Sequence, residues 1–543
     1  MPPGQFNAEF RERLRQAFAT QLPAFLVQQR WFQGKAREIA SVSLADALPM
    51  PMKRTTALIA FARVNYAGGG DEMYVLPLLS RGDCTKRAES SACPLRIPNP
   101  GSPSEILLVD ALAEQEFLTA LLDSVQVDAV YSGDSGQIKA QSIGGLQRIC
   151  SDLPDTRLPR LLKAEQSNTS IVYGDRLILK LFRRVEEGVH PDLEIGRFLT
   201  EVAHFPNTPA TCGSLEYCAK EGQSAAFGIV QEFVPNRGDA WNSTTAFLRD
   251  FLVEAVYYGR EDSLTVDRPM GSVSGVPLSK ELQDLLAANL ESIGLLGRRA
   301  AEMHLALSSA TADPAFVPEA FTSEIRQILK ASLHDLAVRN FDLLRDMAAD
   351  LPESLRDSAA KALKLEEDVL LAFHSTLENH IGATRTRIHG DFHLGQVLVT
   401  EADFLIIDFE GEPAKSLAER RGKRSPLQDV AGMLRSFHYA ARSGMLGARE
   451  ALQSSAVLSP TLEIIAKGWQ SLASQRFLEY YRETAGGAPF LPPGPREFDR
   501  LLRLHLLEKA IYELGYELNN RPAWLAIPLE GIEELLNDRP LIT

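Results

Sequence analysis

Four side chains that could bind a metal ion or accept a proton lie within one short stretch of the chain. They are Asp391, Gln396, Asp408 and Glu410. Mg²⁺ prefers oxygen ligands and usually keeps water or phosphate oxygens in its remaining positions. A carboxylate that does not bind the metal can accept a proton from a substrate hydroxyl. Phosphoryl transfer needs both kinds of group, so these residue types point to that chemistry.

A hairpin is expected to bring these side chains together. Val397–Val399 and Phe404–Ile407 are apolar runs, and the polar segment Thr400–Asp403 joins them. This pattern predicts two short strands with a tight connection. The ends of the hairpin would place residues 389–396 beside Asp408, so that the three carboxylates and the amide share one small volume.

A lysine on a second predicted hairpin is suited to nucleotide phosphates. Residues 170–173 and 176–182 flank Gly174-Asp175, which is a strong turn signal. Lys180 shares one strand face with Ile178 and Phe182. If that face lines a cleft, the ammonium group could neutralise the α- and β-phosphates of ATP. No Walker-A sequence occurs, which disfavours a P-loop ATPase.

Two further segments are expected to help bind the nucleotide. Residues 165–170 (EQSNTS) could cover the phosphates with hydroxyl and amide groups. Residues 231–234 end the last predicted strand before a Pro-Asn-Arg-Gly segment, and this position is typical of a hinge whose backbone pairs with adenine. The hinge residues proposed to contact the nucleotide are Gln231, Glu232 and Val234.

The C-terminal helix carries a stripe of a different character. At 100° per residue, Lys509, Tyr512 and Tyr516 share one face, and the leucines, isoleucine and alanine between residues 507 and 518 share the opposite face. The apolar face should pack on the protein core. Aromatic rings mixed with hydrogen-bond donors are typical of carbohydrate sites, so the stripe is a candidate sugar wall.

The remaining patterns divide the chain into three parts. Residues 1–105 form a cap and linker, with a helix at 8–28, a hairpin at 56–66 and 73–79, and a polar linker at 79–105. Residues 106–235 form a β-rich nucleotide lobe that begins with a helix at 106–123. Residues 236–543 are mostly helical. Expected helices there are 244–258, 280–307, 321–348, 354–380, 426–444, 461–484 and 497–519. This order predicts an α+β fold of two lobes around a cleft.

Composition excludes several other classes. The 543 residues carry a net charge of −14, which disfavours a nucleic-acid binder. The five cysteines form no CxxC pair, and no apolar run is long enough to span a membrane. The first residues are charged and lack the apolar core of a signal peptide. A cytoplasmic protein that uses neither nucleic acid nor membrane is therefore expected.

Several motifs together resemble a known family. His389-Gly390-Asp391, with Gln396 following, and IDFEG at 407–411 resemble the catalytic and metal loops of the aminoglycoside-phosphotransferase and protein-kinase superfamily. That superfamily usually has Asn where Gln396 stands. Gln at this position is similar to the bacterial maltokinases. The same likeness extends to RWFQGK at 30–35, LILKLFRR at 177–184 and KAIYELGYELNNRPAWLAIPLEG at 509–531.

This resemblance implies a bilobal protein-kinase-like fold with an extra N-terminal cap. It implies ATP-dependent phosphorylation of the anomeric hydroxyl of maltose, giving maltose 1-phosphate for glycogen and other α-glucan synthesis. Asp391 would accept the hydroxyl proton, and Gln396, Asp408 and Glu410 would hold Mg²⁺. Lys180, paired with Glu194, would bind ATP. His389, Lys509, Tyr512 and Tyr516 would contact the sugar.

Three alternatives stay open. A kinase for glucosamine or another aminated sugar would need an acidic pocket to bind the amine. The lysine-tyrosine stripe argues against such a kinase. An antibiotic kinase is disfavoured by the N-terminal part and by Gln396. A docking module for trehalose synthase, as a covalent fusion or a complex, is the third, because RWFQGK resembles the cap of proteins that occur with that enzyme.

Overall fold

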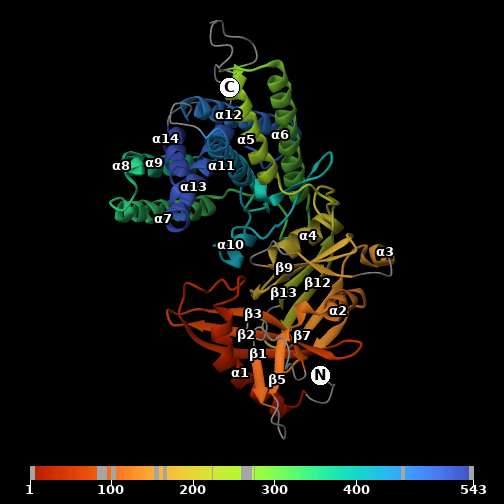
Figure 1. Ribbon diagram of the computed structural model, residues 1–543. Helices are drawn as coiled ribbons and strands as arrows, with labels where there is room; N and C mark the ends of the chain where they lie inside the picture. Colours follow the sequence, from red (N-terminus) through yellow and green to blue (C-terminus); the bar gives the residue numbers. More distant parts are fainter. Residues whose placement is uncertain are drawn as a thin grey trace. The chain divides into compact units, whose positions relative to one another are not determined.

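The computed structural model describes most of the chain as two compact units, residues 1–235 and 236–543. The described residues are 6–81, 95–98, 105–151, 158–162, 168–222, 224–258, 272–273, 276–453 and 459–536. Figure 1 shows the first unit to be rich in strands and the second to be mostly helical.

The first unit begins with a helix and an antiparallel sheet. Helix α1 (Ala8–Leu26) packs its apolar side, including Leu14, Phe18 and Leu22, on one face of this sheet. The strand order is β1-β2-β3-β5-β4, with β11 also pairing with β3. The strands are β1 (Ile39–Pro51), β2 (Thr56–Tyr66), β3 (Asp71–Arg81), β4 (Leu95–Pro98), β5 (Glu105–Asp110) and β11 (Arg184–Val185). The expected β2–β3 hairpin is confirmed.

The segment that follows differs from expectation. A helix was predicted from residue 106, but Glu105–Asp110 is strand β5 of the first sheet, and helix α2 (Gln115–Gln126) starts later. The run Ile106–Val109 is apolar and ends at Asp110, whose side chain accepts from Leu112 N and starts a short 3-10 turn, Ala111–Ala113. The first sheet therefore reaches beyond residue 105. Most of the expected linker, residues 82–94 and 99–104, lies outside the described residues.

A seven-stranded sheet completes the first unit. Its order is β6-β7-β12-β13-β10-β9-β8. The elements are β6 (Val130–Ser132), β7 (Gly136–Ser142), α3 (Leu146–Ser151), β8 (Arg160–Leu161), β9 (Asn168–Tyr173), β10 (Leu177–Phe182), α4 (Pro191–Glu201), β12 (Thr211–Ala219) and β13 (Ser224–Glu232). The predicted β9–β10 hairpin is confirmed, and Gly174 and Asp175 turn with φ of 56° and 52°, which suits a tight hairpin turn.

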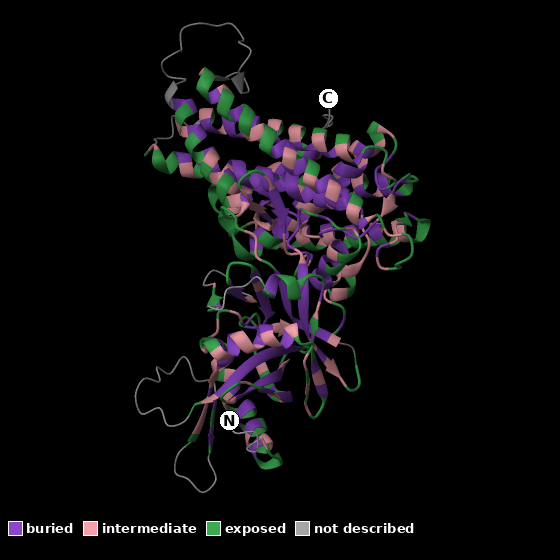
Figure 2. Ribbon diagram, turned by 90° about the vertical axis from the view of Figure 1, so that its right-hand side faces the viewer, coloured by how far each residue is buried: buried purple, intermediate pink, exposed green. Residues whose placement is uncertain are grey.

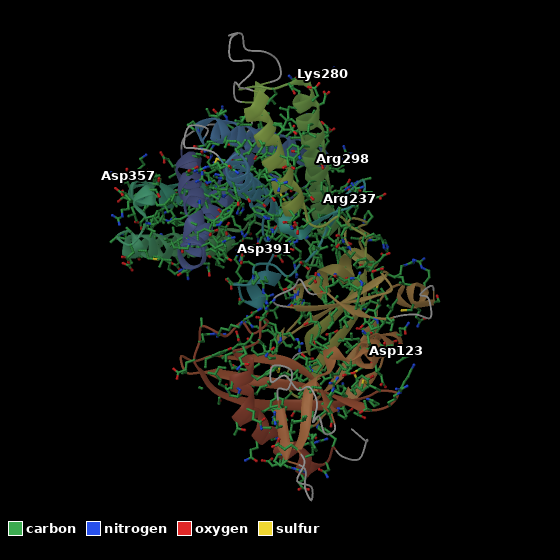
Figure 3. All side chains as sticks on the ribbon, in the orientation of Figure 1. Asp123, Arg237, Lys280, Arg298, Asp357 and Asp391 are labelled. Carbon is green, nitrogen blue, oxygen red and sulfur yellow. The ribbon has the colours of Figure 1, made fainter. Side chains whose placement is uncertain are left out.

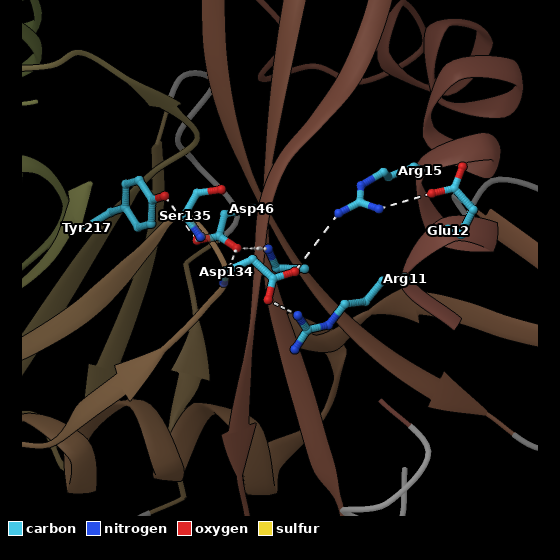
Figure 4. A network of polar contacts seen from close by, with 8 residues as sticks. Arg11, Glu12, Arg15, Asp46, Asp134, Ser135 and Tyr217 are labelled. Atoms are coloured by element: carbon cyan, nitrogen blue, oxygen red, sulfur yellow. Dashed lines mark hydrogen bonds and ion pairs between the residues drawn. The ribbon is translucent and has the colours of Figure 1, made fainter. Parts of the chain in front are cut away.

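The two sheets of this unit share a core and a polar connection. Phe61 of β2 lies 4.2 Å from Tyr217 of β12 between ring centroids, within one continuous apolar cluster. Buried Asp46 of β1 accepts hydrogen bonds of 3.1 Å from Asp134 N, Ser135 N and the Tyr217 hydroxyl. Arg11 of α1 also pairs with Asp134 (Figure 4). The cap and the nucleotide lobe are thus joined by buried contacts.

The second unit is built around helix α11 (Leu427–Ala451). Its helices are α5 (Ala240–Tyr258), α6 (Lys280–Leu307), α7 (Ser323–Met347), α8 (Glu353–Lys364), α9 (Glu366–Glu378), α10 (Leu417–Arg421), α11, α12 (Ser459–Ala485), α13 (Pro495–Asn520) and α14 (Ala526–Leu536). Helix α11 packs against α5, α12 and α13 and is buried along most of its first half. Figure 2 shows the buried residues concentrated in such inner elements.

One expected helix is divided in two. Residues 354–380 were predicted as a single helix, but α8 ends at Lys364 and α9 begins at Glu366. Two lysines close α8, and three acidic residues open α9. Each charge thereby complements the dipole of its own helix end, which favours a break there.

The short strands of the second unit position the chemistry. The predicted hairpin is present as β18 (Val397–Val399) and β19 (Phe404–Ile406), paired antiparallel. Two-stranded pairs are also formed by β14 (Ser272–Val273) with β15 (Val276–Pro277), and by β16 (Glu319–Ala320) with β17 (Thr384–Arg385). Among the described residues, no helix is both long and apolar enough to cross a membrane.

Candidate active site

Helix α11 holds the backbone of the catalytic loop. Asp429, buried near the start of this helix, accepts hydrogen bonds from His389 N at 2.7 Å and Gly390 N at 2.9 Å. Its Oδ2 also accepts from His304 Nε2 of α6 at 3.1 Å. The other ring nitrogen of His304 accepts from the Tyr481 hydroxyl of α12 at 2.9 Å. The loop that precedes Asp391 is therefore fixed to three helices.

His389 fastens the catalytic loop to the neighbouring metal loop. Its Nε2 donates to Ile407 O at 2.8 Å, and its Nδ1 accepts from Asp391 N at 3.4 Å. The side chain is 1 % exposed and lines neither of the cavities described below. Both ring nitrogens of His389 contact backbone groups, and its expected contact with the sugar stays a prediction.

The two loops also touch through glycines. Gly390 and Gly411 have φ of 83° and 72°, a region that favours glycine. A Cβ on Gly390 would lie 3.2 Å from Gly411 Cα. Asp408, which has a side chain, is nevertheless held at φ of 63°. Such backbone conformations in residues other than glycine are concentrated at functional sites.

Asp391, labelled in Figure 3, is a carboxylate whose neighbours include Lys509 and His393. Its side chain is 18 % exposed, and its oxygens lie 3.6 Å from Lys509 Nζ and 3.7 Å from His393 Nε2. His393 Nδ1 accepts from Gly395 N, so Nε2 carries the proton that faces Asp391. Burial raises the pKa of Asp391, but His393 and Lys509 outweigh it and hold that pKa well below its ordinary value.

Replacing Lys509 by methionine is expected to move the acid limb of the activity profile to higher pH. Without the ammonium group the pKa of Asp391 rises, so the carboxylate is protonated, and the base lost, at a higher pH than in the wild type. The measurement is log kcat/KM against pH. Lys330→Met, on the outer helix α7, serves as the control. An acid limb that stays in place would show that Lys509 does not control this carboxylate.

A second set of contacts surrounds the lysine. Lys509 Nζ lies 3.6 Å from Glu412 Oε2 and 4.9 Å from the centre of the Tyr512 ring. The Tyr512 hydroxyl donates to Glu412 Oε1 at 2.7 Å, and the Tyr512 and Tyr516 rings stack with centroids 6.4 Å apart. The predicted stripe therefore exists, and Glu412 joins it to the catalytic loop.

Two cavities of the second unit meet at this stripe. The first has a volume of about 830 Å³ and the second about 720 Å³. Both are lined by Asp391, Glu412, Lys509, Tyr512 and Tyr516. The first cavity is also lined by Trp241, Tyr439, Glu513 and Glu517. The second is also lined by residues of α7 and by His505 and Glu508. Their volumes lie within the range typical of small-molecule sites, about 300–1,000 Å³.

The hairpin places the proposed metal ligands Gln396 and Asp408 at one end. Ile407 N donates to Gln396 O at 3.0 Å, directly before Asp408. The described residues contain no cluster of three or more His, Cys, Asp or Glu side chains arranged for a metal. Mg²⁺ does not require one, because it is commonly held by one or two carboxylates together with phosphates and water. The amide of Gln396 and the carboxylate of Asp408 fit that role by donor chemistry, with Glu410 two residues further on.

The residues expected to bind the nucleotide in the first unit lie on β10, on α4 and at and after the end of β13. Lys180 is 8 % exposed, and its Nζ lies 4.0 Å from Oδ2 of buried Asp192. Glu194 lies on the same helix as Asp192, α4. Gln231 is buried and pairs with Ile178 of β10.

The hinge backbone is only partly available to a nucleotide. Glu232 N donates to Ala210 O at 2.9 Å, so this amide is already bonded inside the protein. Val234 lies two residues further on, just before the boundary of the unit. In the expected phosphate-covering segment, residues 165–167 lie outside the described part of the chain, and 168–170 belong to β9.

Four residues were not assigned a role from the sequence: Asp192 beside Lys180 in the first unit, and His393, Glu412 and Asp429 around Asp391 in the second. His393 and Glu412 lie inside the quoted motifs, and a count of titratable groups within HGDFH and DFEGEP would have marked them. Asp192 and Asp429 each follow a proline in the first turn of a helix, where an acidic residue looks like an ordinary partner of the helix dipole. Only the burial of Asp192 and Asp429 indicates that they also contact Lys180 and the loop before Asp391.

Comparisons with known families agree with this architecture. Residues 25–113 match the maltokinase N-terminal cap domain, and residues 245–461 match the phosphotransferase enzyme family. Among curated proteins, the glucosamine kinase of Streptacidiphilus jiangxiensis is 23 % identical over 377 residues, covering 69 % of this chain and 73 % of that protein. The glucosamine kinase of Mycolicibacterium smegmatis is 24 % identical over 383 residues, covering 70 % and 80 %.

Solved structures give the same fold. A glucosamine kinase in complex with glucosamine, ADP and inorganic phosphate aligns with a TM-score of 0.59 at 18 % identity, over 96 % of this chain and 99 % of that one. Crystal form B of a glucosamine kinase aligns with a TM-score of 0.61 at 17 % identity, with the same coverage.

The phosphotransferase-family match over residues 245–461 and the likeness to curated kinases support a kinase, and the solved structures agree with its fold. The expected α+β, bilobal kinase fold with an extra N-terminal cap is confirmed. More particularly, residues 25–113 resemble the N-terminal cap domain of maltokinases.

Proposed function

We propose that this kinase transfers the γ-phosphoryl group of ATP to the anomeric hydroxyl of maltose. The observation that carries the proposal is Asp391, a carboxylate held ionised by Lys509, at the meeting point of two cavities walled by Tyr512 and Tyr516. A base beside an aromatic sugar wall is what phosphorylation of a sugar hydroxyl requires.

The proposed chemistry uses groups already in place. Asp391 accepts the proton of the attacking hydroxyl as the bond to phosphorus forms and the bond to ADP breaks. His393, whose protonated Nε2 lies beside that carboxylate, orients it and stabilises negative charge on the transferring group. Gln396 and Asp408, with Glu410, hold Mg²⁺, which neutralises phosphate charge when bound. Lys180, Glu194 and the hinge residues Gln231 and Val234 bind the nucleotide.

The acids of the first cavity support a neutral sugar. Apart from the candidate base Asp391, each accepts a hydrogen bond within the protein, and Asp239 accepts from Asn242 N at 2.7 Å. Glu412 accepts from Tyr512 and faces Lys509, Glu513 is bound by Arg435 at 2.7 Å, and Glu517 is bound by Tyr439 at 3.0 Å and Arg521 at 2.7 Å. Because these carboxylates are already paired, the wall offers aromatic faces and polar groups suited to hydroxyls. A volume of about 830 Å³ suits a sugar of two rings.

Glucosamine is the second candidate substrate. Proteins named glucosamine kinases match most of the chain, and several carboxylates line the same cavity, which an amine could approach. A panel of maltose, glucosamine, glucose and maltotriose, assayed for ATP-dependent phosphorylation, separates the candidates. The proposal requires the highest kcat/KM with maltose and a product that no longer reduces copper reagents, because its C1 hydroxyl is blocked. Preference for glucosamine would replace maltose in the proposal.

A Tyr512→Ala variant is expected to raise the KM for the sugar by about tenfold or more, with a smaller change in kcat. The ring supplies a stacking face whose loss weakens ground-state binding, and aromatic contacts of this kind contribute roughly 1–2 kcal/mol. Initial rates over a range of sugar concentrations give both constants. Tyr512→Phe keeps the ring and removes only the bond to Glu412, so it should lie close to the wild type. An unchanged KM in Tyr512→Ala would remove this residue from the sugar site.

The proposed interaction with trehalose synthase is a separate question. RWFQGK was expected to mark a cap that binds this enzyme, whether as a covalent fusion or as a complex. Gel filtration of the chain with and without trehalose synthase tests a complex directly. The described residues of RWFQGK also make contacts within the first unit.

A further inference from the structure

The chain leaves the nucleotide-lobe sheet immediately after Lys180. Strand β10 ends at Phe182, and after Arg183 the residues Arg184 and Val185 form β11, which pairs with Tyr74 and Met73 of β3 in the cap sheet. Val75 N also donates to Arg183 O at 2.8 Å. The strand that bears the nucleotide lysine is therefore continuous with a strand of the cap.

The RWFQGK motif lies against this crossing point. Trp31 and Phe32 follow helix α1, and their rings lie 6.0 Å and 5.1 Å from the ring of Tyr74. A Cβ on Gly34 would come within 2.1 Å of the Tyr66 hydroxyl, so a residue with a side chain does not fit there. The motif is thus packed on β2 and β3, next to the place where β11 joins the sheet.

Both arginines of the crossing segment are bound by the cap. The Arg183 guanidinium lies 5.0 Å from the centre of the Trp31 ring, and its Nη2 donates to Asp110 Oδ2 at 2.8 Å. The residue is only 4 % exposed. Arg184 Nη1 donates to Gln33 Oε1 at 3.0 Å, and its Nε lies 3.4 Å from Oε1 of buried Glu72.

Arg183 also reaches back to the lysine's own hairpin. Its Nε donates to Thr169 Oγ1 at 3.3 Å, and Thr169 pairs with Leu181, the residue after Lys180. One guanidinium thereby contacts the cap motif, the end of the cap sheet and the nucleotide hairpin. Cation–aromatic contacts are strongest when the cation is removed from water, as Arg183 is here.

We infer that RWFQGK is a positioning element for ATP binding. Trp31 and Gln33 hold Arg183 and Arg184, and these fix the end of β10 so that Lys180 is presented to the phosphates in one orientation. The cap is then part of the nucleotide-binding apparatus, whether or not it also binds a partner. This inference rests on the proposed role of Lys180 in binding ATP.

The test compares ATP binding by full-length variants, measured by isothermal titration calorimetry with ATP and Mg²⁺. Trp31→Ala is expected to weaken ATP binding about tenfold, the size of effect expected for loss of a desolvated cation–aromatic contact. Trp31→Phe keeps an aromatic face under Arg183 and should recover most of the affinity. Lys35→Ala changes an exposed residue of the same loop and is the matched control. The affinity for the sugar should stay as in the wild type.

The outcomes separate this inference from the proposed function. A wild-type chain that does not bind ATP would overturn the proposed function. ATP binding that is equal in wild type and Trp31→Ala would overturn the positioning role alone. So would a fall in the affinities for ATP and sugar together with a lower melting temperature, because that is general destabilisation. Should Trp31→Ala not fold, Gln33→Ala replaces it: this exposed side chain holds Arg184, and a two- to threefold weaker ATP affinity is expected.

Discussion

An Asp391→Asn variant is expected to lose about 10²–10⁴-fold in kcat while it folds and binds ATP as the wild type does. The amide matches the carboxylate in shape but cannot accept the hydroxyl proton, and general bases contribute rate factors of this size. Steady-state rates with ATP and maltose give kcat, and calorimetry gives the affinity for ATP. The ammonium group of Lys509 loses its carboxylate partner, so a modest change in stability accompanies the loss of turnover.

Glu401→Gln provides the matched control for this variant. Glu401 is an exposed carboxylate in the turn of the same hairpin, outside both cavities. Its replacement should leave kcat within about twofold of the wild type. If Asp391→Asn retained wild-type turnover, Asp391 would not be the base, and the assignment of the catalytic loop would fail with it.

An Asp429→Ala variant is expected to lose roughly 2–5 kcal/mol of unfolding free energy as well as most activity. The change leaves His389 N and Gly390 N without their acceptor inside the protein, and each buried unsatisfied group costs about 1–3 kcal/mol. Urea denaturation measures the stability, and kcat measures the effect on the loop.

Asp335→Ala, at an exposed position on α7, is the control for Asp429→Ala, and it should change stability by about 0.5 kcal/mol or less. The two Asp variants of the site also differ from each other in a useful way. Asp391→Asn should impair catalysis with little loss of stability, whereas Asp429→Ala should impair both. A stable and active Asp429→Ala protein would contradict the proposed support of the catalytic loop.

Local patterns predicted much of the fold. The two hairpins, β9–β10 and β18–β19, were recognisable because each has apolar strands joined by a short polar turn. Helix α6 was predicted with its observed limits, since its apolar periodicity is regular and Ser279 caps it. The helix predicted from residue 106 was wrong because the same apolar pattern is compatible with both a helix and a strand. Residues 106–109 are apolar enough for either helix or strand, and pairing with β3 decides the matter.

The site was predictable to the extent that its chemistry is confined to contiguous motifs. Asp391, Gln396 and Asp408 could be placed together because one hairpin connects them. Lys509 was assigned to the sugar because it shares a helix face with two tyrosines, and nothing local reveals that its ammonium lies 3.6 Å from Asp391. That distance depends on how α13 packs on α11, a contact between segments about 80 residues apart, which periodicity along one helix cannot specify.

The hydrogen bonds of Asp429 show that the loop before Asp391 and the proposed sugar wall are supported by different helices. The proposed catalytic loop is bound by Asp429 of α11, which contacts α6 and, through His304, α12, whereas the proposed sugar wall lies on α13. Residues of the wall can therefore be exchanged to change which sugar fits, without loosening the backbone that aims Asp391. Lys509 is the point at which the two tasks meet, because it belongs to the wall and yet sets the charge state of the base. An engineered specificity should keep Lys509 and vary the tyrosines around it.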